Sequence, residues 1–172
     1  MIRKATLSDL DAIEAIYNAI HDGEARGLTS IGWKRDIYPT RDTARAAILS
    51  EDMFVMEEGG EILASARINK MQVEEYALVD WSYKARDEDV MVLHTLAVAP
   101  WASGKGFGTR FVNFYEDYAR QNRCPYLRMD TNETNARARA LYKHLGYEEK
   151  GIVRCVFNGI DGVNLVCLEK TL

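Results

Sequence analysis

Cysteine and proline are both scarce in this 172-residue chain. There are three of each, and the cysteines are Cys124, Cys155 and Cys167. An odd, widely spaced set without a CxxC pair supports neither a disulfide framework nor a zinc site. We therefore expect a protein of a reducing, cytoplasmic compartment that holds no metal ion.

Long apolar runs and an excess of positive charge are missing as well. No run of 18 apolar residues exists that could cross a membrane, and residues 1–20 carry acidic side chains where a signal peptide has its apolar core. The 22 basic and 26 acidic residues give a net charge of −4. This balance argues against a nucleic-acid partner, since such proteins normally carry a basic excess. We expect no membrane partner either.

The chain has the composition of an ordinary globular protein. It is 47% hydrophobic and 28% charged, and it contains no repeat, linker or low-complexity tract. Its length favours one domain over residues 1–172, with a core that needs no disulfide or metal to hold it.

Hydrophobic spacing predicts an alternation of strands and helices. The expected strands cover residues 2–5, 53–56, 62–68, 90–98, 126–130, 152–157 and 163–169, and the expected helices cover 9–25, 40–49, 108–122 and 135–145. Ser8 or Asp9 is the expected cap of the first helix. Glu58-Gly59-Gly60 predicts one hairpin, and Asn158-Gly159 with Asp161-Gly162 predicts another. Hairpins impose antiparallel pairs and strand–helix–strand crossovers allow parallel ones, so the sheet should be mixed.

The segment Ser103–Gly108 follows the apolar strand 90–98 and leads into a helix. Glycines at 104, 106 and 108 leave the backbone open to close approach, and Lys105 adds a positive charge. Unpaired amides at a helix N-terminus attract anions. The segment therefore has the features of a phosphate cradle, although a flexible turn of small residues has the same composition.

Two nucleotide motifs can be compared with this segment. The pattern GxxxxGK[ST] does not fit, because no Gly-Lys-Ser or Gly-Lys-Thr ends the loop. The dinucleotide pattern GxGxxG differs by one position from the GxGxG found here. Asp130 ends the next strand about 20 residues later, where a ribose-binding acid would lie. A nucleotide-binding oxidoreductase is therefore one alternative.

Two longer segments resemble a known family. Leu96-Ala97-Val98-Ala99-Pro100 followed by Ser103–Gly108 resembles the acetyl-CoA signature of the GNAT N-acetyltransferases, [Q/R]-x-x-G-x-[G/A]. Asn135–Tyr147 resembles that family's segment N-x-x-A-x-x-L-Y-x-x-x-G-[F/Y]. The predicted order of elements is also similar to that family. Ser103 stands where the family has Gln or Arg, and its hydroxyl can still donate a hydrogen bond to a phosphate.

The resemblance implies a single-domain α/β fold, with a mixed, mostly antiparallel sheet and helices on both faces. It implies an enzyme that moves the acetyl group of acetyl-CoA to a primary amine by direct attack. A bulge near Leu96–Val98 would splay the central strand from its neighbour and expose backbone groups to the cofactor. The expected cofactor-binding residues are Leu96, Ala97, Val98, Ser103, Gly104, Lys105, Gly106, Phe107, Gly108, Thr109, Asn135 and Tyr142.

The resemblance also indicates catalytic residues. Tyr142 lies almost two helical turns after Asn135, and its phenol suits a general acid that protonates the departing thiolate; packing beside Leu141 is the alternative. His94 is a candidate general base for the amine, with a hydrogen-bonded core histidine or a water chain as alternatives. A backbone amide of Leu96 or Val98 would hold the oxyanion.

The acceptor is less well defined by the sequence. It is an amine of a small molecule or a peptide, and residues 27–40 and 72–89 should flank it. Aromatic and acidic residues there suit a cation: Trp33, Tyr38, Tyr76, Trp81 and Tyr83 with Asp36, Glu74, Glu75 and Asp80.

Four further expectations complete the sequence analysis. His21 and His144 should be solvated, and the cysteines have no base beside them for a covalent route. A non-catalytic acyl-CoA sensor is the second alternative function. By family resemblance, a homodimer could form through the C-terminal hairpin, Ile152–Glu169.

Overall fold

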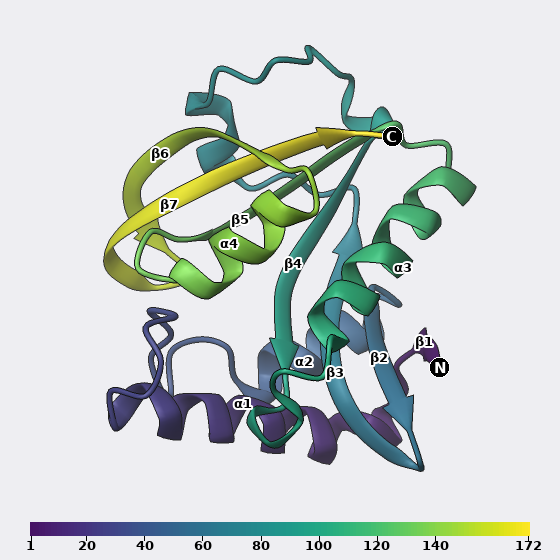
Figure 1. Ribbon diagram of the computed structural model, residues 1–172, viewed down its shortest axis with the longest axis vertical. Helices are drawn as coiled ribbons and strands as arrows, with labels where there is room; N and C mark the ends of the chain where they lie inside the picture. The colour runs from purple at the N-terminus through teal and green to yellow at the C-terminus, as the bar shows by residue number, and fades with distance from the viewer.

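All strands of the computed structural model, which describes residues 1–172, belong to one seven-stranded sheet (Figure 1). The order across the sheet is β1-β2-β3-β4-β5-β7-β6. Only β4 and β5 run parallel, so the expected mixed, mostly antiparallel sheet is confirmed. The strands are β1 Ile2–Lys4, β2 Met53–Glu58, β3 Glu61–Asn69, β4 Val90–Val98, β5 Tyr126–Asn132, β6 Glu148–Phe157 and β7 Ile160–Thr171.

Helices cover both faces of the sheet. They are α1 Leu10–Ala25, α2 Arg41–Leu49, α3 Phe107–Gln121 and α4 Ala136–His144. Figure 1 shows α3 in front of β3 and β4 and α2 behind them. The apolar positions of α1 that predicted a helix are all buried: Leu10, Ile13, Ile16, Tyr17 and Ile20.

The start of α1 differs in detail from the prediction. The Asp9 carboxylate accepts a hydrogen bond from the backbone N–H of Thr6 at 2.8 Å and forms an ion pair with Arg3. Because a short 3₁₀ turn, Leu7–Asp9, precedes α1, Asp9 acts on the backbone before the helix, and its side chain does not cap α1 itself.

The end of α4 agrees with the prediction. Gly146 follows this helix with a φ of +85°, as a helix-ending glycine should.

Both predicted hairpins form. Gly59 and Gly60 have φ of +62° and +81° between β2 and β3, as a tight turn requires. Asn158-Gly159 joins β6 to β7, with Phe157 opposite Ile160. Asp161-Gly162, predicted as part of that turn, lies inside β7 instead. A register irregularity between Cys155 and Phe157 accommodates these residues within the ladder.

The segment between β3 and β4 is largely irregular, with short 3₁₀ turns at Glu74–Leu78 and Asp87–Asp89. A buried ion pair ties it to the sheet. The Arg128 guanidinium lies 3.3 Å from the Glu169 carboxylate, donates to the carbonyl of Tyr83 at 2.9 Å and stacks over Trp81 at 4.1 Å. Arg128 and Glu169 are 5% and 1% exposed, so this segment depends on two desolvated charges.

The buried core contains one polar residue that the sequence analysis expected in solvent. A cluster of 35 buried residues fills the sheet–helix interfaces, and a second of eight lies over β4, β6 and β7. His21, expected in solvent, is buried, and its Nε2 lies 2.9 Å from the carbonyl of Pro39. His144 is exposed as expected, and the three cysteines are unpaired. None of the helices has the length and apolar character needed to cross a membrane.

Candidate active site

A β-bulge interrupts β4 in the middle of the sheet. His94 lies opposite Arg67 and Ala97 lies opposite Ser65, so β4 uses one residue more than β3 over this stretch. Thr95 takes a φ of +54° there. The bulge lies at Thr95 and Leu96, at the start of the predicted range. The extra residue cannot join the ladder, so the bulge leaves local backbone groups free for other partners.

Beyond this point β4 and β5 separate. The parallel pair covers only Val90–Leu93 and Tyr126–Met129. Figure 1 shows the two strands diverging after a common start. A cavity of about 1570 Å³ opens at the splay, lined by α1, residues 27–33, β4, the glycine segment, the end of β5 and α4. The central strands therefore form the floor of a long cleft.

We call one half of this cleft the glycine end, comprising residues 96–109 and 135–142. Gly104 and Gly106 have φ of +80° and +78°, and a Cβ added to either would meet nothing within 4 Å. The backbone N–H groups from Gly104 to Thr109 have no backbone acceptor. Open space above a row of free amides at the start of α3 is the arrangement that binds phosphate oxygens.

Gly108 has a different role from its two neighbours. A Cβ there would lie 3.1 Å from Cδ2 of Leu141, so the missing side chain lets α3 approach α4 closely. The three glycines of the segment therefore divide into two that open the backbone to the cleft and one that serves helix packing.

The structure brings most of the predicted residues together in the cleft. Those that line it are His94, Leu96, Val98, Ser103, Gly104, Gly106, Phe107, Gly108, Thr109, Asn135 and Tyr142. Two do not. Ala97 is 1% exposed and belongs to the main core, and the Lys105 side chain is exposed outside the lining.

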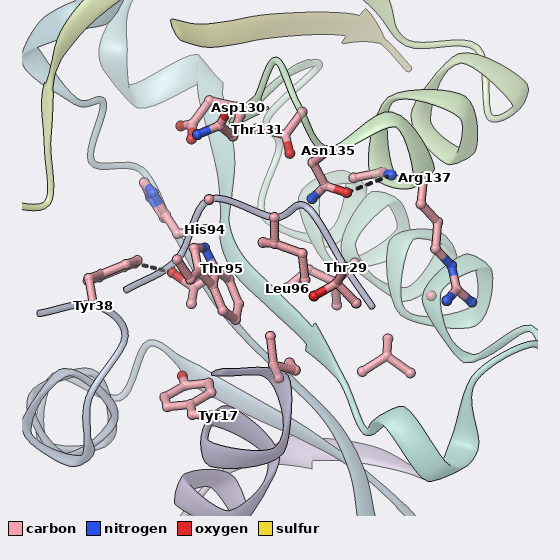
Figure 2. A pocket seen from close by; sticks show the side chains of 18 of the residues that line it. Tyr17, Thr29, Tyr38, His94, Thr95, Leu96, Asp130, Thr131, Asn135 and Arg137 are labelled. Atoms are coloured by element: carbon pink, nitrogen blue, oxygen red, sulfur yellow. Dashed lines mark hydrogen bonds between the residues drawn. The ribbon is translucent and has the colours of Figure 1, made fainter. Parts of the chain in front are cut away.

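Asn135 and Tyr142 both face the cleft from α4, as their spacing predicts. Asn135 is the N-cap, and its Oδ1 accepts from the N–H of Ala138 at 3.2 Å, drawn as a dashed line in Figure 2. Tyr142 is 6% exposed, and its hydroxyl has no hydrogen-bond partner in the protein. Burial raises the pKa of Tyr142, so the phenol keeps its proton at neutral pH. A protonated, unpartnered hydroxyl is available as a donor.

His94 lines the cleft but is not free. Its Nε2 lies 3.0 Å from Oδ1 of Asn69, so Nε2 carries the hydrogen. Burial, with the nearby Arg67, lowers the pKa of His94 to about 4. The extra residue at the bulge also shifts the alternation of β4: Val90 and Val92 belong to the smaller core cluster, whereas Leu96 and Val98 pack against the larger. Regular alternation along β4 predicts that His94 shares a face with Leu96 and Val98, and the bulge makes that prediction wrong.

The other half of the cleft, which we call the aromatic end, contains Tyr17, Trp33, Tyr38, Thr95 and Asp130. Figure 2 labels all of these except Trp33. Trp33 meets Tyr17 and Tyr38 edge to face, with ring centroids 6.2 and 6.4 Å apart. The hydroxyls of Tyr38 and Thr95 are hydrogen-bonded to each other. Side chains from four separate segments thus make this wall.

The residues expected around the acceptor are only partly at this end. Trp33, Tyr38, Glu74 and Glu75 line the cleft as expected. The others lie outside the lining: Asp36, Tyr76, Asp80, Trp81 and Tyr83. Trp81 is instead stacked on Arg128, and Tyr83 packs against Tyr126.

Asp130 stands where β5 leaves β4, one residue past the last parallel pair. Its Oδ2 accepts a hydrogen bond from the Tyr76 hydroxyl at 2.8 Å. Burial raises the pKa of Asp130 to about 7. The spacing that suggested a ribose-binding acid was misleading, because the sheet has one parallel pair and not the doubly wound parallel sheet of a dinucleotide fold.

Three cleft residues escaped the sequence analysis. Thr95 could not be singled out, since a positive φ at a threonine leaves no sequence signal. Tyr17 reads as a core position of an amphipathic helix. Arg137 lies inside the second motif and lines the cleft without an ion-pair partner, and its charge beside the glycine segment was the signal that could have found it.

Comparison with known proteins agrees with this geometry. The model of the Acetyltransferase (GNAT) family matches residues 12–147. The chain is 28% identical over 148 residues to the N-acetyltransferase YhfO of Bacillus subtilis (strain 168), covering 86% of this chain and 89% of that protein.

Solved structures show the same fold. A GNAT-family acetyltransferase from Streptococcus agalactiae superposes with a TM-score of 0.82 at 25% identity, covering 100% of this chain and 95% of that one. The structure of yncA from Salmonella typhimurium with its cofactor acetyl-CoA gives a TM-score of 0.70 at 21% identity, covering 100% and 93%. The family match spans most of the chain, including the bulged strand, the glycine segment and the whole of α4. The protein is an enzyme of the acetyltransferase (GNAT) family.

Proposed function

We propose that this enzyme transfers the acetyl group of acetyl-CoA to a primary amine by direct attack in the cleft between β4 and β5. The observation that carries the proposal is the row of free amides from Gly104 to Thr109, which continues the splayed β4 into the start of α3. Such a row suits a pyrophosphate, and the free backbone of the bulge suits an amide-containing arm.

The glycine end would hold the cofactor along its length. The amides of residues 104–109 bind the phosphates, with the Ser103 hydroxyl and the unpaired Arg137 beside them. Leu96 and Val98 border the arm, and a backbone amide of one of them stabilises the oxyanion. Acetyl-CoA supplies the activated thioester carbonyl. Asn135, whose Oδ1 is engaged by the helix cap, keeps its amide group as a donor.

Tyr142 is the proposed general acid. Its hydroxyl faces the cleft, has no partner in the protein and stays protonated because burial raises its pKa. It can therefore donate a proton to the thiolate that leaves when the carbon–sulfur bond breaks. Packing alone would not require a hydroxyl at this buried position.

His94 is the candidate general base that the sequence analysis named for the amine. The imidazole is neutral at pH 7, as a base must be, but its low pKa and its bond to Asn69 make it a weak proton acceptor. His94 stays a prediction that a His94→Gln variant tests: loss of the acidic limb of the pH profile supports it.

The homodimer also stays a prediction. β6 is an edge strand, and two of its large apolar side chains, Ile152 and Val156, are 50% and 60% exposed. Light scattering of the purified protein should give twice the monomer mass, and Val156→Lys should shift it toward the monomer. A monomeric wild type rejects the dimer. A cytoplasmic location remains the expectation from the unpaired cysteines.

A panel of amines tests the proposed function. Release of the CoA thiol is followed with acetyl-CoA and, in turn, spermidine, 2-phenylethylamine, lysine and an alanyl peptide. Amine-dependent release above the rate of hydrolysis supports an N-acetyltransferase. Calorimetric binding of acetyl-CoA with no release for any amine would instead fit the acyl-CoA sensor.

A further inference from the structure

Asp130 is a carboxylate inside the cleft that has no cationic partner. No arginine, lysine or histidine forms an ion pair with it, and its carboxylate accepts one hydrogen bond, from the neutral hydroxyl of Tyr76 at 2.8 Å. The three almost fully buried carboxylates, Asp9, Glu116 and Glu169, all pair with arginine or lysine. Asp130 is half-buried in the cleft wall and has no such partner. A carboxylate largely removed from water without a counter-ion is costly, so its retention at a ligand cleft indicates a cationic ligand.

We propose that Asp130 binds the ammonium group of the acceptor and takes its proton, with Tyr76 positioning the carboxylate. The proposal rests on the proposed function and names the base and the charge state of its substrate. Asp130 lies at the splay of β4 and β5, in the same cleft as the Tyr142 hydroxyl. The aromatic rings of Tyr38 and Trp33 complete a surface that favours a cation.

Asp130 and Tyr142 together account for every proton that moves in the reaction. The ammonium transfers one proton to the Asp130 carboxylate, and the free amine forms the carbon–nitrogen bond with the thioester carbonyl. As the carbon–sulfur bond breaks, the Tyr142 hydroxyl gives its proton to the thiolate. The second proton of the amine nitrogen restores the phenol, and Asp130 returns its proton to water.

The surroundings of Asp130 suit this exchange. Tyr76 and Glu75 face it from the 3₁₀ turn, Tyr142 from α4, Tyr38 from the α1–α2 loop, Cys155 from β6 and Cys167 from the neighbouring position of β7. None of these side chains is a cation. Burial and Glu75 raise the pKa of Asp130, while the Tyr76 hydrogen bond lowers it, and the balance is about 7. A carboxyl near neutral pH is a much better base than an ordinary aspartate.

Tyr76 is a positioning residue, because it lies outside the cleft lining and acts through Asp130. It is 3% exposed, its carbonyl accepts from the Trp81 indole N–H at 2.9 Å, and the two rings meet edge to face. The 3₁₀ turn therefore holds the hydroxyl in place. Since that hydroxyl stabilises the ionised carboxylate, its removal should raise the pKa of Asp130 further.

The first test is a titration of the free enzyme by carbon-13 NMR with labelled aspartate carboxyls. One resonance should titrate near pH 7, disappear in Asp130→Asn and titrate at a higher pH in Tyr76→Phe. Titration of Asp130 in the ordinary aspartate range would overturn the proposal. The affinity for acetyl-CoA, measured by calorimetry, should stay within about twofold of the wild-type value in both variants. A twofold change is small beside the tenfold change that 1.4 kcal/mol represents.

The second test is the pH profile of kcat/KM with the amine of the panel that the wild type acetylates fastest. Asp130→Asn should lose the acidic limb and fall by about 10²-fold or more at pH 8. Tyr76→Phe should move the limb to higher pH and recover activity above it. Loss of the limb in His94→Gln, with the limb kept in Asp130→Asn, would assign the base to His94 and overturn the proposal. An Asp130→Asn enzyme with an unchanged limb, or a Tyr76→Phe enzyme without a shift, overturns the proposal.

The two possible failures are distinguishable. If the wild type binds acetyl-CoA but acetylates no amine, the proposed function fails and this inference fails with it. If the wild type acetylates an amine and Asp130→Asn does so with the same pH profile, only the role of Asp130 is rejected.

Discussion

The two ends of the cleft differ in the groups that line them. The glycine end uses backbone: free amides between Gly104 and Thr109 and the bulged strand at Leu96. The aromatic end uses side chains that come from α1, the α1–α2 loop, β4 and β5. A backbone site can serve many related sequences, whereas a side-chain site changes with each substitution. The comparison explains why a cofactor could be proposed from the sequence and an acceptor could not.

The largest expected effect concerns the support of the aromatic end. Glu169→Gln should destabilise the protein by about 3 kcal/mol or more, because it leaves the buried Arg128 without its counter-charge. Urea unfolding measures this loss. Glu149→Gln is the matched control, since the Glu149–Arg139 pair lies at the surface and should matter far less. Equal losses in the two variants would show that the buried pair does not hold the segment over β5 and β7.

Tyr142→Phe tests the proposed general acid, which lies where the two ends of the cleft meet. The ring keeps its packing against Tyr147, so folding and acetyl-CoA affinity should change little. Loss of the proton donor should lower kcat by about 10²-fold. Tyr118→Phe, which removes a hydroxyl outside the cleft, should leave kcat unchanged. A near-normal kcat in Tyr142→Phe would leave Tyr142 as a packing residue.

Gly106→Asp sharpens the comparison at the glycine end. The added carboxylate would stand in open space beside the free amides and repel a phosphate, so we expect CoA affinity to fall about tenfold or more, a cost of at least about 1.4 kcal/mol. Gly106 has a φ of +78°, so part of any effect is backbone strain. Gly106→Asn carries similar strain without the charge and should bind CoA more tightly than Gly106→Asp. Calorimetry showing equal affinities would remove the phosphate site.

The last set of effects consists of pH-dependent changes in stability. His94 has a folded pKa of about 4, below its ordinary 6.5, so the unfolded state binds its proton first and stability falls as the pH drops from 6.5 to 4. Asp130 has a folded pKa of about 7, above its ordinary 3.8, so its contribution falls as the pH rises from 4 to 7.

Variants separate these opposite trends. When the pH is lowered from 7.5 to 5, His94→Gln should gain urea resistance relative to wild type, and Asp130→Asn should lose it. The change between the two pH values is the quantity compared, because it cancels pH-independent packing effects. Parallel curves for His94→Gln and wild type would contradict a buried, neutral imidazole.

The sequence predicted the fold well where local rules decide. The helices α1 and α4, the Gly59-Gly60 turn and the open glycines Gly104 and Gly106 follow from spacing, turn chemistry and helix termini. The prediction failed where a long-range arrangement decides. Asp161-Gly162 reads as a turn, but pairing with β6 keeps it in a strand. His21 reads as solvated, but the chain at Pro39 covers it.

The candidate site shows the same division. Asn135 and Tyr142 were predicted from the resemblance to the family segment, and α4 with its N-cap sets the spacing that puts both in the cleft. Asp130 was noticed for an incorrect reason, since the distance along the chain says nothing of Tyr76, 54 residues away, that binds it. Thr95 depends on a bulge that only the pairing of β3 with β4 defines.

The most direct test of the account is the stoichiometry of the reaction. Wild-type enzyme, acetyl-CoA and the accepted amine are incubated, and free thiol and acetylated amine are quantified in the same sample. The account predicts one acetylated amine for each CoA released, at a rate far above that without amine. Thiol release without acetylated amine, or none with any amine tested, would contradict the claim that the two ends form one acetyl-transfer site.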